Sequence, residues 1–162
     1  MPAVISNTSP RQYLYQADAL SLLPQLFGTL CVPEAVAAEL QAGRQRNVRL
    51  PDPEALPWLT VRPVKQPALL PLVTHLGDGE KEVLALGLET PGSLLLLDDR
   101  DARRHARLLT LKVSGTLGVL LLAKERGKLD AVRPILDRLD ALRFRIHPTT
   151  RQAVLRLAQE AD

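Results

Sequence analysis

The chain has 162 residues, of which 46% are hydrophobic, 24% charged and 3% aromatic, and its net charge is +3. This composition is typical of one globular domain, here residues 1–162, and the few aromatic residues argue against a module that reads bases by stacking. No apolar run approaches the roughly 20 residues of a membrane span, and no secretory signal is visible, so we expect a cytoplasmic protein without a membrane partner. The basic charge is compatible with a polyanionic partner.

The first part of the chain alternates short apolar strands with helices. Residues 3–5 predict a strand, residues 19–26 a helical stretch kinked at Pro24, and residues 30–32 a second strand. A helix over 33–43 follows, opened by a proline and closed by a glycine.

A proline-rich excursion at about 43–71 interrupts this pattern, and only residues 59–61 suggest a short strand within it. The alternation then returns. Asp78 is the predicted N-cap of a helix over 79–89, and the apolar run 94–97 is the clearest strand of the chain.

The last part continues the alternation to the end of the sequence. The predicted elements are a helix over 100–109, a strand at 112–113, a helix over 117–124, an amphipathic helix capped by Asp130, a strand at 144–146 and a helix over 149–159. We therefore predict an α/β fold, a three-layer α/β/α sandwich around a mainly parallel sheet of about four or five strands. Such sheets bind ligands at the carboxyl ends of their strands.

Oxygen-bearing side chains follow three of the predicted strands, at 7–9, 98–99 and 114–116. No His or Cys accompanies them, so the expected ion is Mg²⁺ or Mn²⁺ rather than zinc. Successive strand residues point to opposite faces, and we expect Asp99 to enter a shared pocket while Asp98 caps the next helix or supports the pocket. The simpler interpretation is that both acids only stabilise a helix N-terminus.

Two helices supply further acids. Glu39 borders an apolar helix stripe, where a carboxylate is costly without a partner or a metal, although a glutamate that reaches water explains it equally well. Glu80 and Glu82 point about 200° apart, so at most one of them enters a pocket. Glu82 is the predicted one because it leads directly into an apolar run, yet acids in a first helical turn are also favoured by the dipole alone.

A basic stripe follows Asp99 and is formed by Arg100, Arg103, Arg104 and Arg107. Beside a metal pocket, such a stripe is a predicted contact for a nucleic-acid backbone. Taken alone, it is also explained by a solvated helix face with local ion pairs.

Five segments stand in order along nearly the whole chain: VISNTSP (4–10), CVPEAV (31–36) with Glu39-Leu40, GEKEVLAL (79–86), LLLDDRDAR (95–103) and VSGTLGVL (113–120). Together they resemble the PIN-domain family, in particular a prokaryotic branch assigned to nucleic-acid binding. The first and fourth segments are the most specific.

This resemblance implies an endoribonuclease that holds one or two Mg²⁺ or Mn²⁺ ions, often as a dimeric toxin blocked by an antitoxin protein. Carried over by position, the catalytic set is Asn7, Glu39, Glu82 and Asp99. The metal ligands are expected among Glu39, Glu82, Asp99 and Asp98. Supporting positions are Thr8, Ser9, Glu80 and Thr116.

Asn7 departs from the family pattern, because the active enzymes have an aspartate there. It offers a metal only a neutral carbonyl oxygen, and the alternative function is therefore a catalytically weak or inactive module that binds RNA or a protein partner. A phosphotransfer domain using Asp98 or Asp99 is a third interpretation. That chemistry lacks its usual lysine after a late strand and its aspartate after the first strand.

Overall fold

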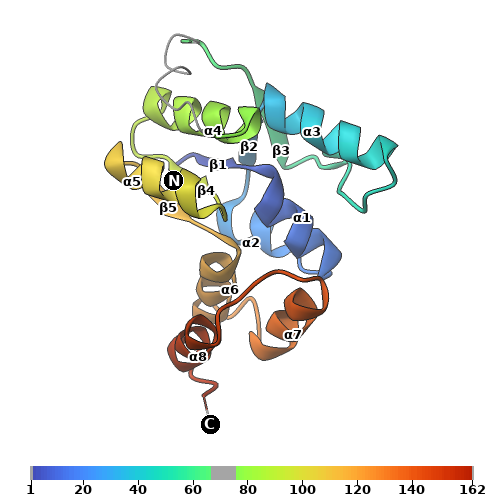
Figure 1. Cartoon of the computed structure of the whole chain (residues 1–162), viewed down its shortest axis with the longest axis vertical. Coiled ribbons are helices and arrows are strands. Elements are labelled where there is room, and N and C mark those ends of the chain that lie inside the picture. Colours follow the sequence, from blue (N-terminus) through green and yellow to red (C-terminus); the bar gives the residue numbers. More distant parts are fainter. Residues whose placement is uncertain (1, 67–75, 162) are drawn as a thin grey trace.

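The computed structural model describes residues 2–66 and 76–161 (Figure 1). The excursion predicted at 43–71 therefore lies partly outside the described residues. The strands are β1 (Val4–Ser6), β2 (Leu30–Pro33), β3 (Leu59–Arg62), β4 (Leu94–Leu96) and β5 (Lys112–Ser114). All pairings are parallel, in the order β3-β2-β1-β4-β5, so β1 lies at the centre of the sheet.

The helices lie on both faces of this sheet. They are α1 (Thr8–Gln16), α2 (Leu22–Phe27), α3 (Glu34–Gln45), α4 (Asp78–Glu89), α5 (Arg100–Leu108), α6 (Thr116–Glu125), α7 (Arg133–Ala141) and α8 (Pro148–Leu157), with a 3-10 turn η1 at Pro53–Ala55. In Figure 1, α3 and α4 cover one face, while α2 and α6 lie on the other with α1 beside them. The predicted α/β/α sandwich with a parallel sheet is confirmed.

Burial explains why the strands form. Ile5, Val32 and Leu95 are fully buried, because helices cover the sheet on both sides and the inner strands β1, β2 and β4 are mostly apolar. Polar side chains therefore come together at the ends of the strands.

Several predicted boundaries differ from the structure. The stretch predicted over 19–26 is preceded by α1, which begins at Thr8 and ends before Asp18, a residue in the left-handed region at φ 59°. Pro24 does not kink a helix, because it stands in the first turn of α2, where its missing N–H is unneeded. Gly43 does not close α3, which continues to Gln45, and the N-cap of α4 is Gly77 rather than Asp78.

The strand predicted at 144–146 is wrong. These residues have no partner strand, and they run as an extended segment between α7 and α8 (Figure 1). Phe144 and Ile146 pack against the core while Arg145 is exposed. An extended segment lying on the core has the same alternating pattern as a strand, and this explains the error.

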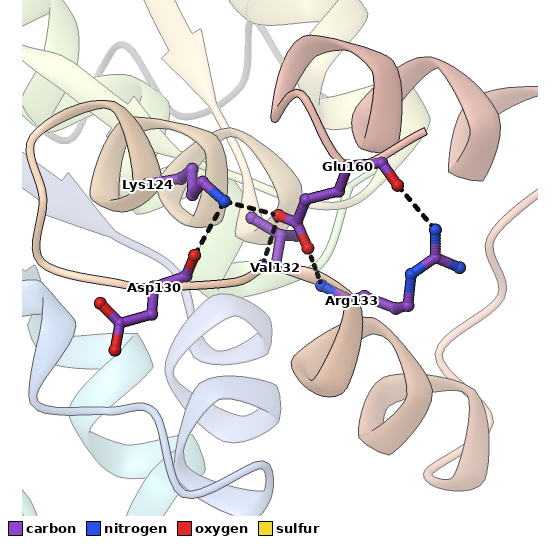
Figure 2. Close-up of polar contacts among 5 residues, drawn as sticks. All are labelled: Lys124, Asp130, Val132, Arg133 and Glu160. Atoms are coloured by element: carbon purple, nitrogen blue, oxygen red, sulfur yellow. Dashed lines mark hydrogen bonds and ion pairs between the residues drawn. The ribbon is translucent and has the colours of Figure 1, made fainter. Parts of the chain in front are cut away.

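The cap predicted at Asp130 is also wrong. The first turn of α7 is capped by Glu160, whose carboxylate accepts from the backbone N–H groups of Val132 (2.7 Å) and Arg133 (3.1 Å) and pairs with Lys124 (3.2 Å; Figure 2). Asp130 only offers its backbone carbonyl to Lys124 (2.8 Å). A segment that follows α8 therefore fixes the corner between α6 and α7.

Candidate functional site

The carboxyl ends of β1, β4 and β5 meet at one edge of the sheet. Asn7 donates its backbone N–H to Leu96 of the neighbouring strand (3.0 Å). The next two residues reach the acids on either side, because Thr8 Oγ1 donates to Glu39 (2.6 Å) and Ser9 Oγ donates to Asp98 (3.1 Å). The structure thus brings together the oxygen-bearing side chains that the sequence predicted at these strand ends.

Asp98 is fully engaged in hydrogen bonds. Its carboxylate accepts from the backbone N–H of Thr116 (2.7 Å), from Thr116 Oγ1 (2.7 Å) and from Ser9. Gly115 makes this approach possible, since a Cβ there would lie 2.7 Å from an Asp98 oxygen. Asp98 therefore joins the ends of β1 and β4 to the N-terminus of α6.

Asp99 is the N-cap of α5, and its carboxylate accepts from the backbone N–H of Ala102 (2.9 Å). The sequence had suggested Asp98 for this cap, but Asp98 points instead toward α6. Asp99 is solvent-exposed, and its side chain is hydrogen-bonded with Glu80.

Glu39 and Glu82 hold α3 and α4 together by capping each other's helix. Glu39, on α3, accepts from the backbone N–H of Gly79 at the start of α4 (3.3 Å). Glu82, on α4, accepts from the backbone N–H of Ala35 at the start of α3 (3.0 Å). Because its carboxylate stabilises a helix N-terminus, Glu82 already has a structural role.

Glu80 lies next to Asp99 and Glu39. Burial is the largest cause that raises the pKa of Glu80 to about 7, and the negative charge of Asp99, a hydrogen bond with the Asp99 side chain and the charge of Glu39 raise it further. Its Oε2 atom is buried and has no hydrogen-bond partner among the described residues. Of the two glutamates, Glu80 therefore shares the environment of Asp99 and Glu39, although the resemblance implied only a supporting position for it.

Asn7 and Arg11 complete the buried side of this cluster. Asn7 is 7% exposed and occupies the N-cap position of α1, yet its side chain does not cap the helix and its Oδ1 has no described partner. Arg11 is fully buried; its Nε donates to the Asn7 carbonyl (3.5 Å), and its two terminal nitrogens are unpartnered within the described residues. Burial lowers the pKa of Arg11 to about 9, so it is charged at neutral pH, and it interacts with Glu39.

Sequence reasoning missed Arg11, because nothing in the pattern distinguishes a buried arginine from an exposed one. The only signal is its position one helical turn after Asn7. A buried cation lowers the repulsion among the acids, which otherwise carry like charges within one small region.

The donor set at this cluster fits Mg²⁺ or Mn²⁺. Each of Glu80, Asp99 and Asn7 offers an oxygen ligand, and two of these oxygens, Glu80 Oε2 and Asn7 Oδ1, are buried without a described partner. Within residues 2–66 and 76–161, no three His, Cys, Asp or Glu side chains are arranged as a metal site. Mg²⁺ does not require three, since it is commonly bound by one or two carboxylates and keeps several waters.

A groove of about 1630 Å³ begins at Asp98 and Asp99 and runs between α5 and residues 143–147. Three arginines of the predicted stripe line it: Arg100, Arg103 and Arg107. Arg104 is exposed but does not line this groove. Arg143 and Arg145 also line the groove. Sequence reasoning missed both, because Arg145 was assigned to the strand predicted at 144–146 and Arg143 to no element.

One family model matches a region of the sequence that includes all five strands of the sheet. The family model described as "DUF3368: PIN domain" matches residues 3–160. No curated protein matches the sequence. None of the described helices is long and apolar enough to cross a membrane.

Proposed function

Because the chain belongs to the PIN-domain family, we propose that it is a divalent-metal-dependent endoribonuclease with its ion at Glu80, Asp99 and Asn7. The family match supports a nuclease-type fold and an interaction with nucleic acid. The observation that supports the metal centre best is Glu80, a carboxylate with an unpartnered buried oxygen beside two further carboxylates. Burial is the largest cause of the raised pKa of Glu80, and a cation would relieve the repulsion from Asp99 and Glu39 that adds to it.

Each residue of the cluster has a distinct role in this proposal. Glu80 and Asp99 bind the ion as charged ligands, and Asn7 adds a neutral oxygen. Glu39 is oriented by Thr8 and Gly79 and completes the negative potential around the site. A bound divalent ion supplies an activated water and stabilises negative charge on the attacked phosphate.

The experiment that tests this function is cleavage of a mixed single-stranded RNA with Mg²⁺, Mn²⁺ or EDTA, using wild type, Asp99→Asn and Asp101→Asn. Asparagine is also a good N-cap, so Asp99→Asn keeps α5 intact and removes one charge. Asp101→Asn removes the same charge at an exposed position of α5. Metal-dependent cleavage that Asp99→Asn abolishes and Asp101→Asn retains supports the proposal. Equal activity in all three proteins contradicts the assignment of Asp99.

A second candidate function is a module that binds RNA or a protein partner without cutting. Asn7 favours it, because the position contributes no negative charge and Arg11 adds a buried positive one. Absence of cleavage, together with RNA binding that persists in EDTA, distinguishes this module from the enzyme.

We also propose a cellular location, an oligomeric state and a biological role for the protein. The protein would act in the cytoplasm as a homodimeric toxin that an antitoxin protein blocks, and these three points rest on the family resemblance. Light scattering tests the dimer, and a monomer at micromolar concentration contradicts it. Growth arrest on expression, relieved by a co-expressed neighbouring gene, tests the toxin role.

A further inference from the structure

We propose that the buried guanidinium of Arg11 is a built-in counter-ion of Glu39 and takes the place of one cation, so that the acidic cluster binds a single divalent ion. The inference rests on the metal centre of the proposed function, and it adds the number of ions and the residue that sets this number. It concerns binding only, so it can be tested without a measurement of RNA cleavage.

Arg11 stands at a core position of α1. The buried residues of this helix are Pro10, Arg11 and Leu14, which form one side of it. Arg11 is fully buried and is the largest such side chain among the described residues. A methionine of similar length would fill the same space without a charge. Because burial of a charge is costly, the charge itself needs a partner that explains it.

Direct contacts do not supply this partner. Arg11 Nε donates to the Asn7 carbonyl at 3.5 Å, and the two terminal nitrogens, Nη1 and Nη2, are buried without a hydrogen-bond partner among the described residues. Arg11 also forms no ion pair within the part of the chain that the structure describes. The guanidinium is therefore stabilised by attraction at longer range, from a carboxylate that lies near it without touching it.

That carboxylate is Glu39. Burial lowers the pKa of Arg11 to about 9, and the negative charge of Glu39 opposes this lowering, so Arg11 stays charged at neutral pH. Both carboxylate oxygens of Glu39 already accept hydrogen bonds, one from Thr8 Oγ1 (2.6 Å) and the other from the backbone N–H of Gly79 (3.3 Å). Glu39 thus has donors for each oxygen and a nearby positive charge, which together replace what a second metal ion would give it.

The other carboxylates at the strand ends divide into two groups. Asp98 lies close enough to Arg103 to interact with its charge, and Glu82 accepts from the N-terminus of α3, so both are balanced by protein groups. Glu80 and Asp99 instead repel each other, and neither forms an ion pair with a Lys or Arg of the described residues. The charge of these two carboxylates is matched by one divalent ion.

The test counts the Mn²⁺ ions bound per chain by equilibrium dialysis of the whole protein, at Mn²⁺ concentrations up to saturation. Arg11→Met removes the charge and keeps the length of the side chain, and Arg11→Lys keeps the charge. Arg156→Met is the matched control, because it removes the same charge from an exposed position of α8. We expect one ion per chain for wild type, Arg11→Lys and Arg156→Met, and two ions for Arg11→Met.

A double variant identifies the group that holds the second ion. Arg11→Met/Glu39→Gln removes both members of the proposed pair, so its count should return to one. A count that stays at two in this variant would overturn the assignment of Glu39 as the partner of Arg11. Circular dichroism checks that each variant folds. If Arg11→Met does not fold, Arg11→Gln takes its place, since its neutral amide can still donate to the Asn7 carbonyl.

Equal counts in wild type and Arg11→Met would overturn the inference, and so would two ions in wild type. A second ion in Arg156→Met would also overturn it, because the count would then reflect the net charge of the protein. Wild type that binds no Mn²⁺ contradicts the metal centre of the proposed function. In that case a gain of one ion in Arg11→Met still supports the role of Arg11 as a substitute cation, whereas no gain overturns it.

Discussion

Replacing Glu80 and replacing Glu82 should have opposite effects on stability, although both lie on α4 and both lose one negative charge as glutamine. Glu80→Gln removes a carboxylate whose charged form is disfavoured first by burial and then by Asp99 and Glu39, so the folded protein should become more stable at neutral to alkaline pH. Glu82→Gln weakens the cap at Ala35, so the folded protein should become less stable.

The magnitude for Glu80 follows from its pKa. A rise from 4.5 to about 7 corresponds to about 3.4 kcal/mol, and partial exposure of the side chain screens this to roughly 1–2 kcal/mol. Because the pKa is raised in the folded state, the favourable contribution is fully present below pH 4.5 and is lost as pH rises through 7. The gain in Glu80→Gln should therefore appear between these values and level off above them. For Glu82→Gln, the loss of charge at a helix N-terminus costs about 0.3–1 kcal/mol.

Urea unfolding at a series of pH values from 4 to 9 measures both effects, in EDTA and again with Mn²⁺. In EDTA, the two variants should diverge from wild type in opposite directions above pH 7. With Mn²⁺, wild type and Glu82→Gln should both be stabilised by the ion, because their metal ligands are intact. Glu80→Gln should show little stabilisation by Mn²⁺.

One result refutes this reasoning directly. If Glu82→Gln loses the response to Mn²⁺ while Glu80→Gln keeps it, then Glu82 is the metal ligand and the helix must rotate or shift when the ion binds. A Glu80→Gln variant that is less stable than wild type at pH 8 would show that Glu80 is not repelled by its neighbours.

Three further predictions follow from other residues. Asn7→Asp should lower stability in EDTA, because it adds a buried charge to the acidic cluster, but should bind Mn²⁺ at least tenfold more tightly, as measured by calorimetry. Glu160→Gln should cost about 1–2 kcal/mol in urea unfolding at pH 7, since backbone and Lys124 hydrogen bonds lower the pKa of Glu160 despite the opposing effect of its burial. This contribution is present above pH 4.5 and is lost as pH falls through the lowered pKa, so the difference from wild type should shrink in acid. Arg107→Ser should weaken RNA binding in anisotropy more than Arg104→Ser, because only Arg107 lines the groove; equal losses would contradict the groove boundary.

The fold could be predicted because the inner strands are mostly apolar on both faces and the helices between the strands have clear periodicity. Runs such as Leu94–Leu96 cannot be accommodated except inside a covered sheet. Helix ends were less predictable, because several helices of this chain are followed by non-glycine residues, such as Asp18 and Asn47, in left-handed conformations. The cap of α7 was unpredictable for a different reason, since Glu160 reaches it from another element.

The choice between Glu80 and Glu82 illustrates what the pattern of one helix cannot decide. The four residues that follow Glu82 are all buried, so α4 has no exposed stripe that would fix its rotation about its own axis. Only packing against the sheet and α3 determines which glutamate faces Asp99. The position of Glu82 as a metal ligand stays a prediction, whereas its contact with Ala35 is part of the structure.

The clamp made by Glu160 has a consequence for the order in which the molecule is completed during translation. Val132 precedes Glu160 by 28 residues, so the start of α7 stays uncapped for roughly 1–6 seconds of synthesis. The acidic residues at the strand ends emerge earlier, whereas Arg143 and Arg145 follow a helix whose first turn is capped only once Glu160 has been added. A nascent chain therefore carries the acids of the strand ends before α7 has its cap.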